Sequence, residues 1–181
     1  MPNYIEKDGI KFTFCHIPRT AGGSIASALD IKSVGHSVQI PAKDKFIFCF
    51  VRNPFDRVVS IYYYLKQGGK NDKDKADAQK YVKDYSFSQF VKKSLARGSE
   101  EQIHMRPQTY WIPKGADFIG YYENLDFYYK YLVNMIGIKY KELPHFHSSA
   151  HQPFRVYYND ELLNLVYDIY SQDFRLFPKK R

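Results

Sequence analysis

The chain is poor in the features that mark secreted and membrane proteins. Its 181 residues include two cysteines, Cys15 and Cys49. Both lie in apolar runs, where a buried free thiol is the usual role and a disulfide is not expected. No run approaches the roughly 20 apolar residues that span a bilayer. The N-terminus also lacks the charged, apolar and small-residue order of a signal peptide. We therefore expect a soluble cytoplasmic protein with no transmembrane segment.

Acidic residues are fewer than basic ones, at 19 Asp and Glu against 27 Lys and Arg, which gives a net charge of +8. This excess favours an anionic partner, such as a nucleotide, an acidic polymer or a membrane surface, and charge alone does not choose among them. Hydrophobic residues at 44% and charged residues at 25% are ordinary globular values. A chain of this length is expected to form one domain, residues 1–181.

The first informative stretch is a strand pattern that leads into a glycine-containing loop. Residues 11–17 are short, aromatic and β-branched, and Gly22-Gly23-Ser24 precedes a helix-compatible run. Such a loop turns backbone N–H groups toward one point, where a phosphate or a similar anion can bind, with Arg19, Thr20 and Ser24 alongside. The nucleotide-binding pattern Gly-x-x-x-x-Gly-Lys-Ser/Thr is absent. A connection that needs glycine only for its geometry is an equally good interpretation of this loop alone.

The second informative stretch joins a buried strand to a helix. Residues 45–51 are almost continuously apolar, as expected of a strand buried on both faces of a parallel sheet. Arg52 follows, and Pro54 suits the first turn of a helix that carries Ser60. Arg52 therefore lies at the carboxyl end of the strand, and ligands of open α/β sheets bind at the edge where the carboxyl ends of the strands lie. A nucleoside triphosphatase would often place a magnesium-binding aspartate there. An arginine recognises an anion directly, so we expect no metal.

The rest of the chain alternates further helix and strand patterns. Helices are predicted for 86–97, 122–136 and 160–170, with Ser86 and Asn159 as N-caps, and a short strand is predicted for 117–121. Residues 66–84 are rich in charge and glycine, which predicts a mobile, solvated loop and helix start, with an acceptor-side lid as the alternative. The pattern as a whole predicts an α/β domain with a central parallel sheet flanked by helices.

Two groups of histidines are candidates for functional roles. Residues 104–111 combine hydrogen-bonding and aromatic groups around Pro107, which suits either a loop that lines a pocket or a helix-breaking connection. His145, His147 and His151 match no standard zinc spacing and have no cysteine nearby, so a plain loop is favoured over a metal site.

Together, the two anion motifs resemble those of the sulfotransferases that use 3′-phosphoadenosine 5′-phosphosulfate (PAPS), most closely the carbohydrate-type family that includes heparan and chondroitin sulfotransferases. The run His16-Ile-Pro-Arg-Thr-Ala-Gly-Gly-Ser24 is similar to that family's 5′-phosphosulfate loop. The run Phe50-Val-Arg-Asn-Pro-Phe-Asp-Arg-Val-Val-Ser-Ile-Tyr62 is similar to its 3′-phosphate motif. Similarity continues through Gly35-His36, 104–108, 118–125 and 170–174, and so covers most of the chain.

The resemblance implies a P-loop-like sulfotransferase fold and a division of roles among residues. The donor PAPS, and the product adenosine 3′,5′-bisphosphate (PAP), are expected to bind residues of the two motifs: Arg19, Thr20, Ala21, Gly22, Gly23, Ser24, Arg52 and Ser60. His36 matches the catalytic histidine and is the expected general base. Arg19 stands where the family usually has lysine, so we expect it to stabilise charge without donating a proton.

The acceptor side is defined only by resemblance. His104, Arg106 and Gln108 are predicted to contact the acceptor, which is expected to be a saccharide hydroxyl. His151 and Arg155 are further candidates for contact with the cofactor.

Two other functions compete with sulfuryl transfer. A nucleotide kinase or other phosphoryl transferase shares the broad fold, but the missing lysine and aspartate argue against it. A basic module that binds nucleic acid or another polyanion without chemistry would explain the charge and the 31 tyrosines and phenylalanines (17 Tyr and 14 Phe). It would not explain why the two motifs occur together, so no nucleic-acid partner is expected.

Overall fold

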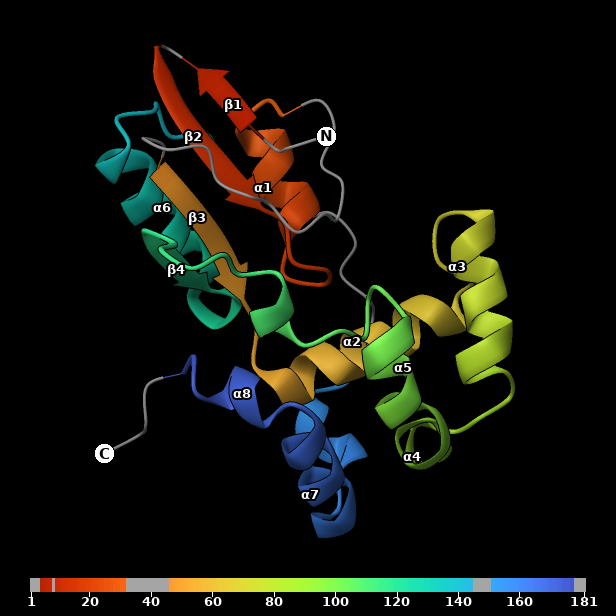
Figure 1. The fold of residues 1–181 in the computed structure, drawn as a ribbon. Coiled ribbons are helices and arrows are strands. Elements are labelled where there is room, and N and C mark those ends of the chain that lie inside the picture. The colour runs from red at the N-terminus through yellow and green to blue at the C-terminus, as the bar shows by residue number, and fades with distance from the viewer. Residues whose placement is uncertain (1–3, 8, 32–45, 145–150, 178–181) are drawn as a thin grey trace. The chain divides into compact units, whose positions relative to one another are not determined.

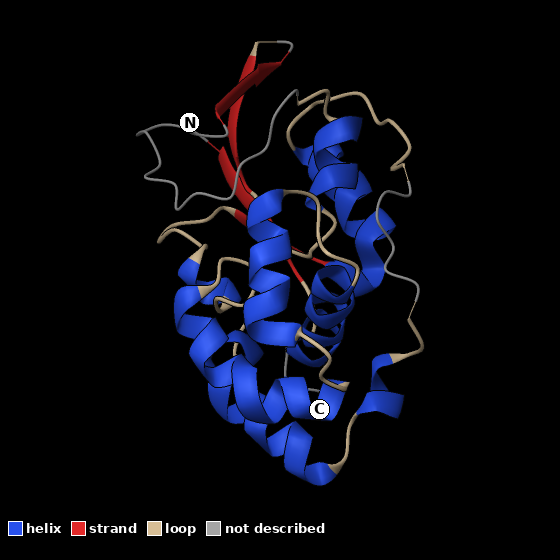
Figure 2. Cartoon of the chain, turned by 90° about the vertical axis from the view of Figure 1, so that its right-hand side faces the viewer, coloured by secondary structure: helices blue, strands red, loops and turns tan. Residues whose placement is uncertain are grey.

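The computed structural model describes residues 4–7, 9–31, 46–144 and 151–177. The chain divides into two compact units. The first unit comprises Met1–Arg52 and Gln108–Ser148, and the second comprises Asn53–Pro107 and Ser149–Arg181. Among the described residues, the strands belong to the first unit, whereas the second unit is built from helices and loops. Figure 2 shows the strands in red and the helices in blue.

The first unit contains a sheet with the order β1-β2-β3-β4. Its strands are β1 (Tyr4–Lys7), β2 (Ile10–Cys15), β3 (Phe46–Val51) and β4 (Phe118–Tyr121) (Figure 1). Strand β2 pairs in parallel with β3, and β3 pairs in parallel with β4. The register sets Cys15 opposite Cys49 and Val51 opposite Tyr121, so the carboxyl ends of the three parallel strands lie along one edge.

Aromatic residues of β2 and β3 form the core of the first unit. Phe12, Phe14, Phe48 and Phe50 are essentially inaccessible to solvent. They pack against buried residues of α1 (Gly22–Ala28) and α6 (Leu125–Met135), which follows the one-turn helix η4 (Tyr122–Asn124). The two cysteines occupy the alternate positions as buried free thiols, as expected, and burial raises the pKa of Cys15 to about 11. A thiol with that pKa is chemically inert near neutral pH.

The second unit is helical, and its sequence specifies several of its helix starts. Its elements are α2 (Pro54–Lys66), α3 (Asp72–Asp77), η1 (Ala78–Val82), α4 (Phe87–Phe90), η2 (Val91–Leu95), α5 (Ala96–Glu101), η5 (Phe154–Tyr157), α7 (Asp160–Ile169) and α8 (Ser171–Phe174). The predicted N-caps are confirmed. Ser86 and Gln89 form a reciprocal capping box at α4, and the Asn159 side chain accepts a hydrogen bond from the Leu162 N–H at 3.0 Å.

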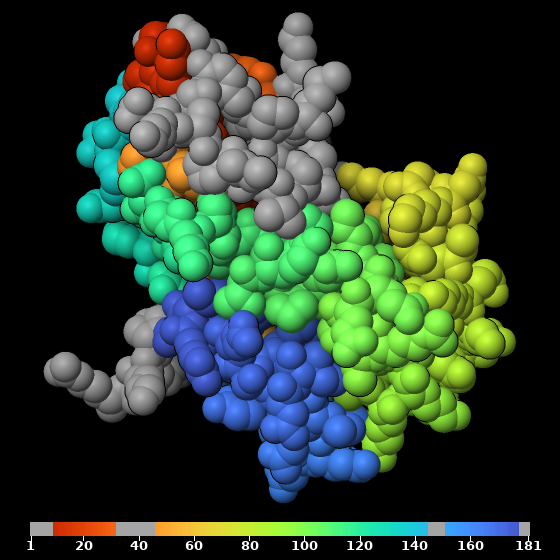
Figure 3. All heavy atoms as spheres, viewed as in Figure 1, coloured from red at the N-terminus to blue at the C-terminus, as the bar shows by residue number. Residues whose placement is uncertain are grey.

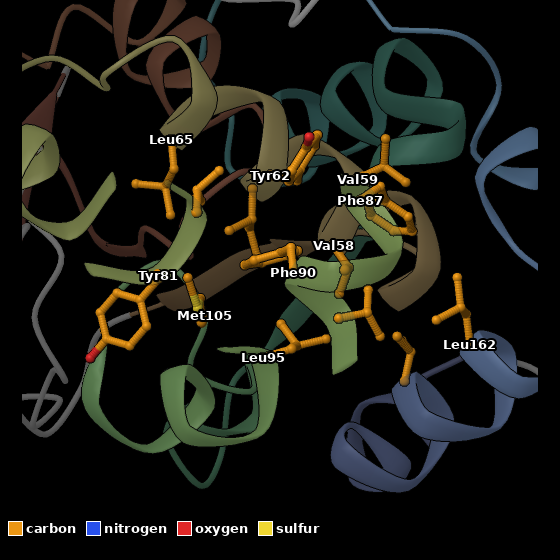
Figure 4. Close-up of a cluster of buried hydrophobic side chains, with 14 of the residues drawn as sticks. Val58, Val59, Tyr62, Leu65, Tyr81, Phe87, Phe90, Leu95, Met105 and Leu162 are labelled. Atoms are coloured by element: carbon orange, nitrogen blue, oxygen red, sulfur yellow. The ribbon is translucent and has the colours of Figure 1, made fainter. Parts of the chain in front are cut away.

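The core of the second unit is a cluster of apolar side chains from α2, the 78–95 region and α7. Figure 4 shows Val58, Tyr62 and Leu65 of α2 near Phe90 and Leu95, with Leu162 approaching from α7. Met105 completes the cluster. The helical segments predicted at 86–97 and 160–170 therefore bury apolar residues at helical spacing, as expected.

The α/β class and the central parallel sheet flanked by helices are confirmed. The structure contains one strand that the sequence did not predict. This strand is β1, which pairs antiparallel with β2 through a tight turn in which Gly9 has a φ of 76°. The predicted helix at 86–97 extends to Glu101 and includes π-helical residues 91–95. The charged segment 66–84 is helical over 72–82, whereas its predicted mobility is not tested.

Candidate functional site

The loop between β2 and α1 has an unusual backbone. Arg19 and Ala21 both have positive φ angles, of 68° and 65°, although neither is glycine. Ala21 is the N-cap residue of α1, and no side chain in the described part of the chain caps this helix. A non-glycine residue with a positive φ angle costs free energy, and such residues are concentrated at ligand clamps and active sites. The strained loop follows a parallel strand at the carboxyl edge, which is where the sequence places the anion site.

Gly22 has a packing reason as well as a place in the motif. A Cβ atom at this position would lie 1.8 Å from Cδ2 of His16, so the imidazole ring occupies the space that any side chain would need. The His16 ring in turn stacks on Phe14 of β2, with ring centroids 5.7 Å apart. The close approach of His16 and Gly22 therefore ties the start of the loop to the first turn of α1.

The other predicted loop residues differ in their access to a ligand. Thr20 is buried, and its hydroxyl donates a hydrogen bond of 2.9 Å to the Ile17 carbonyl. A phosphate oxygen needs a donor, so Thr20 would have to exchange this bond to contact one. Ser24 is also buried, whereas Gly23 is exposed and Arg19 is half-buried. In this structure, Thr20 stabilises the loop, while Gly23 and Arg19 lie at its accessible surface.

Arg52 is held close to the loop at the end of β3. Its Nη1 atom lies 3.4 Å from the Arg19 carbonyl oxygen, and its guanidinium carbon lies 4.1 Å from the centre of the Tyr122 ring. The side chain of Gln108 accepts from the Arg52 N–H and donates to the Arg52 carbonyl, both at 2.8 Å. Arg52 is therefore buried and fixed along its length, beside the first anion motif.

The three residues predicted to contact the acceptor have structural contacts. His104 is buried, with Nε2 3.2 Å from Oδ1 of Asp74. The Arg106 carbonyl accepts a 2.9 Å hydrogen bond from Arg57, and Gln108 holds the backbone of Arg52. These contacts favour a positioning role for Gln108. Acceptor contact by the three residues stays a prediction.

Asp74 is a buried carboxylate in the second unit that the sequence pattern did not predict. Burial alone would raise its pKa, but hydrogen bonds from the Tyr64 hydroxyl and the Lys70 N–H, together with the charge of His104, outweigh burial and lower the pKa. The Asn71 side chain caps α3 at the Asp74 N–H. Asp74 therefore anchors the charged segment to the loop at His104, which is a role in stability.

Several lysines of the charged segment are paired. Lys75 lies 3.0 Å from Asp72 and Lys73 lies 2.9 Å from Asp77. Lys66, at the end of α2, is directed at the carbonyls of Lys83 and Tyr85. Of these residues, Lys66, Lys75 and Lys83 border a hollow of about 380 Å³. Figure 3 shows the surface of α3 in yellow. Because Lys73 and Lys75 are paired with aspartates of the same segment, a solvated helical surface fits it better than an anion-attracting lid.

The remaining predicted residues lie in the second unit or outside the described residues. Ser60 is buried on α2 in the second unit. His151 is stacked on Tyr63, with centroids 5.7 Å apart, and Arg155 is exposed. His36, the predicted base, lies outside the described residues, as do His145 and His147. The roles of all these residues stay predictions.

Metal clusters and membrane-spanning helices are both absent from the described ranges. No group of three or more His, Cys, Asp or Glu residues there could hold a metal ion. No helix in the same ranges is both long and apolar enough to cross a membrane.

Comparison with known proteins identifies the class of protein that carries this fold and the second of the two motifs. Residues 30–180 match the Sulfotransferase family, so the chain belongs to that family. The match includes Arg52 and Ser60 and begins after the glycine-containing loop. The resemblance of the loop to a 5′-phosphosulfate loop therefore rests on its own residues.

One curated relative is an uncharacterized protein of Archaeoglobus fulgidus. It is 35% identical to this chain over 80 residues, which are 44% of this chain and 58% of the relative. The chain thus matches little more than half the length of that relative. No solved structure matches the chain.

Proposed function

We propose that the protein transfers a sulfuryl group from PAPS to an acceptor hydroxyl, with a saccharide as the acceptor class. The observation that supports this proposal is the approach of Arg52 to the loop: its Nη1 atom lies 3.4 Å from the Arg19 carbonyl oxygen, so the arginine that follows β3 lies beside the glycine-containing loop within the first unit. Membership of the Sulfotransferase family supports the same reaction. The saccharide rests on the resemblance of the motifs to carbohydrate-type enzymes.

The proposed reaction needs anionic groups to be held at two points. The accessible backbone at Gly23 and the side chain of Arg19 are suited to the 5′-phosphosulfate. The Arg52 guanidinium, with its fork of donors, is suited to the 3′-phosphate. Ser60 is proposed as a further 3′-phosphate contact from the resemblance alone.

The chemical step exchanges one S–O bond for another. The acceptor oxygen bonds to sulfur as its proton passes to a base, for which His36 is proposed. The bond between sulfur and the bridging oxygen breaks, and PAP leaves with that oxygen. Arg19 is proposed to stabilise the charge that develops on the departing phosphate.

The cofactor is tested by thermal stabilisation. We expect PAP to raise the melting temperature much more than equal concentrations of 5′-AMP or of ATP with magnesium, because only PAP has the 3′-phosphate. Arg52→Ala should weaken PAP binding by about 1.5–3 kcal/mol, the scale of a hydrogen bond to a charged group, and should leave 5′-AMP binding almost unchanged. Equal stabilisation by all three nucleotides would remove the case for PAPS.

A further inference from the structure

We propose that Gln108 and Tyr122 are positioning residues that hold Arg52 ready for a 3′-phosphate, and so determine the selectivity of the protein for 3′-phosphorylated nucleotides. This inference rests on the proposed function and concerns residues that need not touch the nucleotide. It follows from how the backbone and the side chain of Arg52 are held within the first unit.

The backbone of Arg52 is fixed on both sides of its Cα atom. The ladder between β3 and β4 ends at the pair Val51 and Tyr121, so Arg52 lies one residue beyond it. At Arg52 the carboxamide of Gln108 replaces the neighbouring strand as hydrogen-bond partner. Its oxygen accepts from the Arg52 N–H, and its nitrogen donates to the Arg52 carbonyl. Because these two groups belong to successive peptide planes, holding both restrains φ and ψ of Arg52 and hence the direction of its side chain.

Gln108 is itself well fixed. Its side chain is fully buried, and its main chain begins the short helix η3 (Gln108–Tyr110), in which the Trp111 N–H donates to the Gln108 carbonyl at 2.9 Å. A buried carboxamide with both ends bonded to one residue loses two hydrogen bonds at once if it moves. Gln108 and Tyr122 are called the Arg52 clamp below, and Gln108 is the part of the clamp that is fixed by hydrogen bonds at both ends of its carboxamide.

The other end of Arg52 is held by an aromatic ring. Tyr122 follows β4 directly, and its ring centre lies 4.1 Å from the guanidinium carbon. A guanidinium stacked on a ring keeps its plane fixed while its edge can still donate hydrogen bonds. With both the Cα atom and the guanidinium plane restrained, little side-chain entropy is lost when an anion binds.

The test compares affinity for PAP with affinity for 5′-AMP by calorimetric titration. In Gln108→Leu and in Tyr122→Leu we expect the ratio of the two affinities to fall about tenfold or more, since a loosely held arginine loses the 3′-phosphate and not the rest of the nucleotide. Tyr122→Phe keeps the ring and should retain the wild-type ratio. Gln108→Glu can accept from the Arg52 N–H but cannot donate to its carbonyl, so its ratio should also fall.

A matched control separates positioning from folding. Gln102 is another buried glutamine, whose side chain accepts from the His104 and Met105 N–H groups in the second unit. Gln102→Leu should lower the melting temperature, as we also expect for Gln108→Leu, and should leave the affinity ratio unchanged. A comparable fall in this control would mean that the ratio reports general loosening, which would overturn the clamp.

Two further outcomes keep the hypotheses distinct. If the wild type prefers PAP and Arg52→Ala abolishes that preference while Gln108→Leu and Tyr122→Leu retain it, the clamp is wrong and the proposed function stands. If the wild type does not prefer PAP, the proposed function and the clamp's role in selectivity fail together.

The rigidity of the Arg52 side chain is measured separately, without nucleotide, by ¹⁵N relaxation of the Arg52 Nε–H. An order parameter no higher in the wild type than in Tyr122→Leu overturns the clamp.

Discussion

Gly22→Ala is the substitution whose effect the loop geometry defines most closely. The Cβ atom would meet the His16 ring at 1.8 Å, and forcing a side chain into filled space costs about 1–3 kcal/mol. Replacing glycine by alanine within a helix stabilises it by about 0.5–1 kcal/mol. The clash outweighs this gain in helix propensity, so we expect a net loss of about 1–2 kcal/mol in the free energy of unfolding.

The same substitution should have the opposite sign once the ring is removed. In a His16→Ala background the clash is absent, and Gly22→Ala should stabilise the protein by about 0.5–1 kcal/mol through helix propensity alone. His16→Ala itself loses the stacking on Phe14, which affects both arms of the cycle equally. The two substitutions should therefore couple by about 2 kcal/mol.

The assay is urea unfolding of the four proteins, followed by circular dichroism, with linear extrapolation to water. The coupling energy is the cost of Gly22→Ala in the wild-type background minus its cost in the His16→Ala background. If the two costs agree within about 0.5 kcal/mol, the close approach of His16 does not explain the glycine. The reasoning for the loop would then be wrong.

Three further predictions concern the second unit and the proposed base. Asp74→Asn should lower the free energy of unfolding by about 1.5–3 kcal/mol at neutral pH. Because the pKa of Asp74 is lowered in the folded state, this contribution is present above the ordinary carboxyl pKa and is lost as pH falls through the folded value. Melting temperatures of the two proteins should therefore converge in acid, and a gap that is constant with pH would contradict the assignment. Ser86→Ala, measured by urea unfolding, should cost about 1 kcal/mol through loss of the capping box, and an unchanged midpoint would argue against the cap. His36→Ala should keep PAP affinity and melting temperature while single-turnover transfer falls about 10²–10⁴-fold, and near-normal turnover would exclude it as the base.

Local patterns made much of the fold predictable. The apolar run of β3 and the apolar faces of α6 and α7 are set by residues close in sequence, as are the caps at Ser86 and Asn159. Strand β1 was not predicted because it is short and polar, although Asp8-Gly9 is a two-residue sequence typical of hairpins. That turn signal was the available clue.

The candidate site was predictable where a strand end fixes a residue's place, and less so where side chains pair at long range. Arg52 follows a buried strand, so its position at the sheet edge could be inferred. Gln108 bonds the backbone of a residue 56 positions away, and such a contact leaves no periodic trace in the sequence. Tyr122 could have been found, because it follows β4 at the same sheet edge. The pair of Asp74 and His104 is likewise 30 positions apart, and Asp74 lies in a charged segment whose composition is typical of a solvated loop.

Sulfuryl transfer is tested most directly by following the sulfuryl group itself. The protein is incubated with ³⁵S-labelled PAPS and a panel of saccharide, phenol and alcohol acceptors, in the presence of a chelator. We predict that label moves to a saccharide hydroxyl, that PAP appears in equal amount, and that Arg52→Ala slows the transfer at limiting PAPS. If no acceptor takes up label while γ-labelled ATP with magnesium phosphorylates one of them, the protein is a phosphoryl transferase and the role given to Arg52 is contradicted.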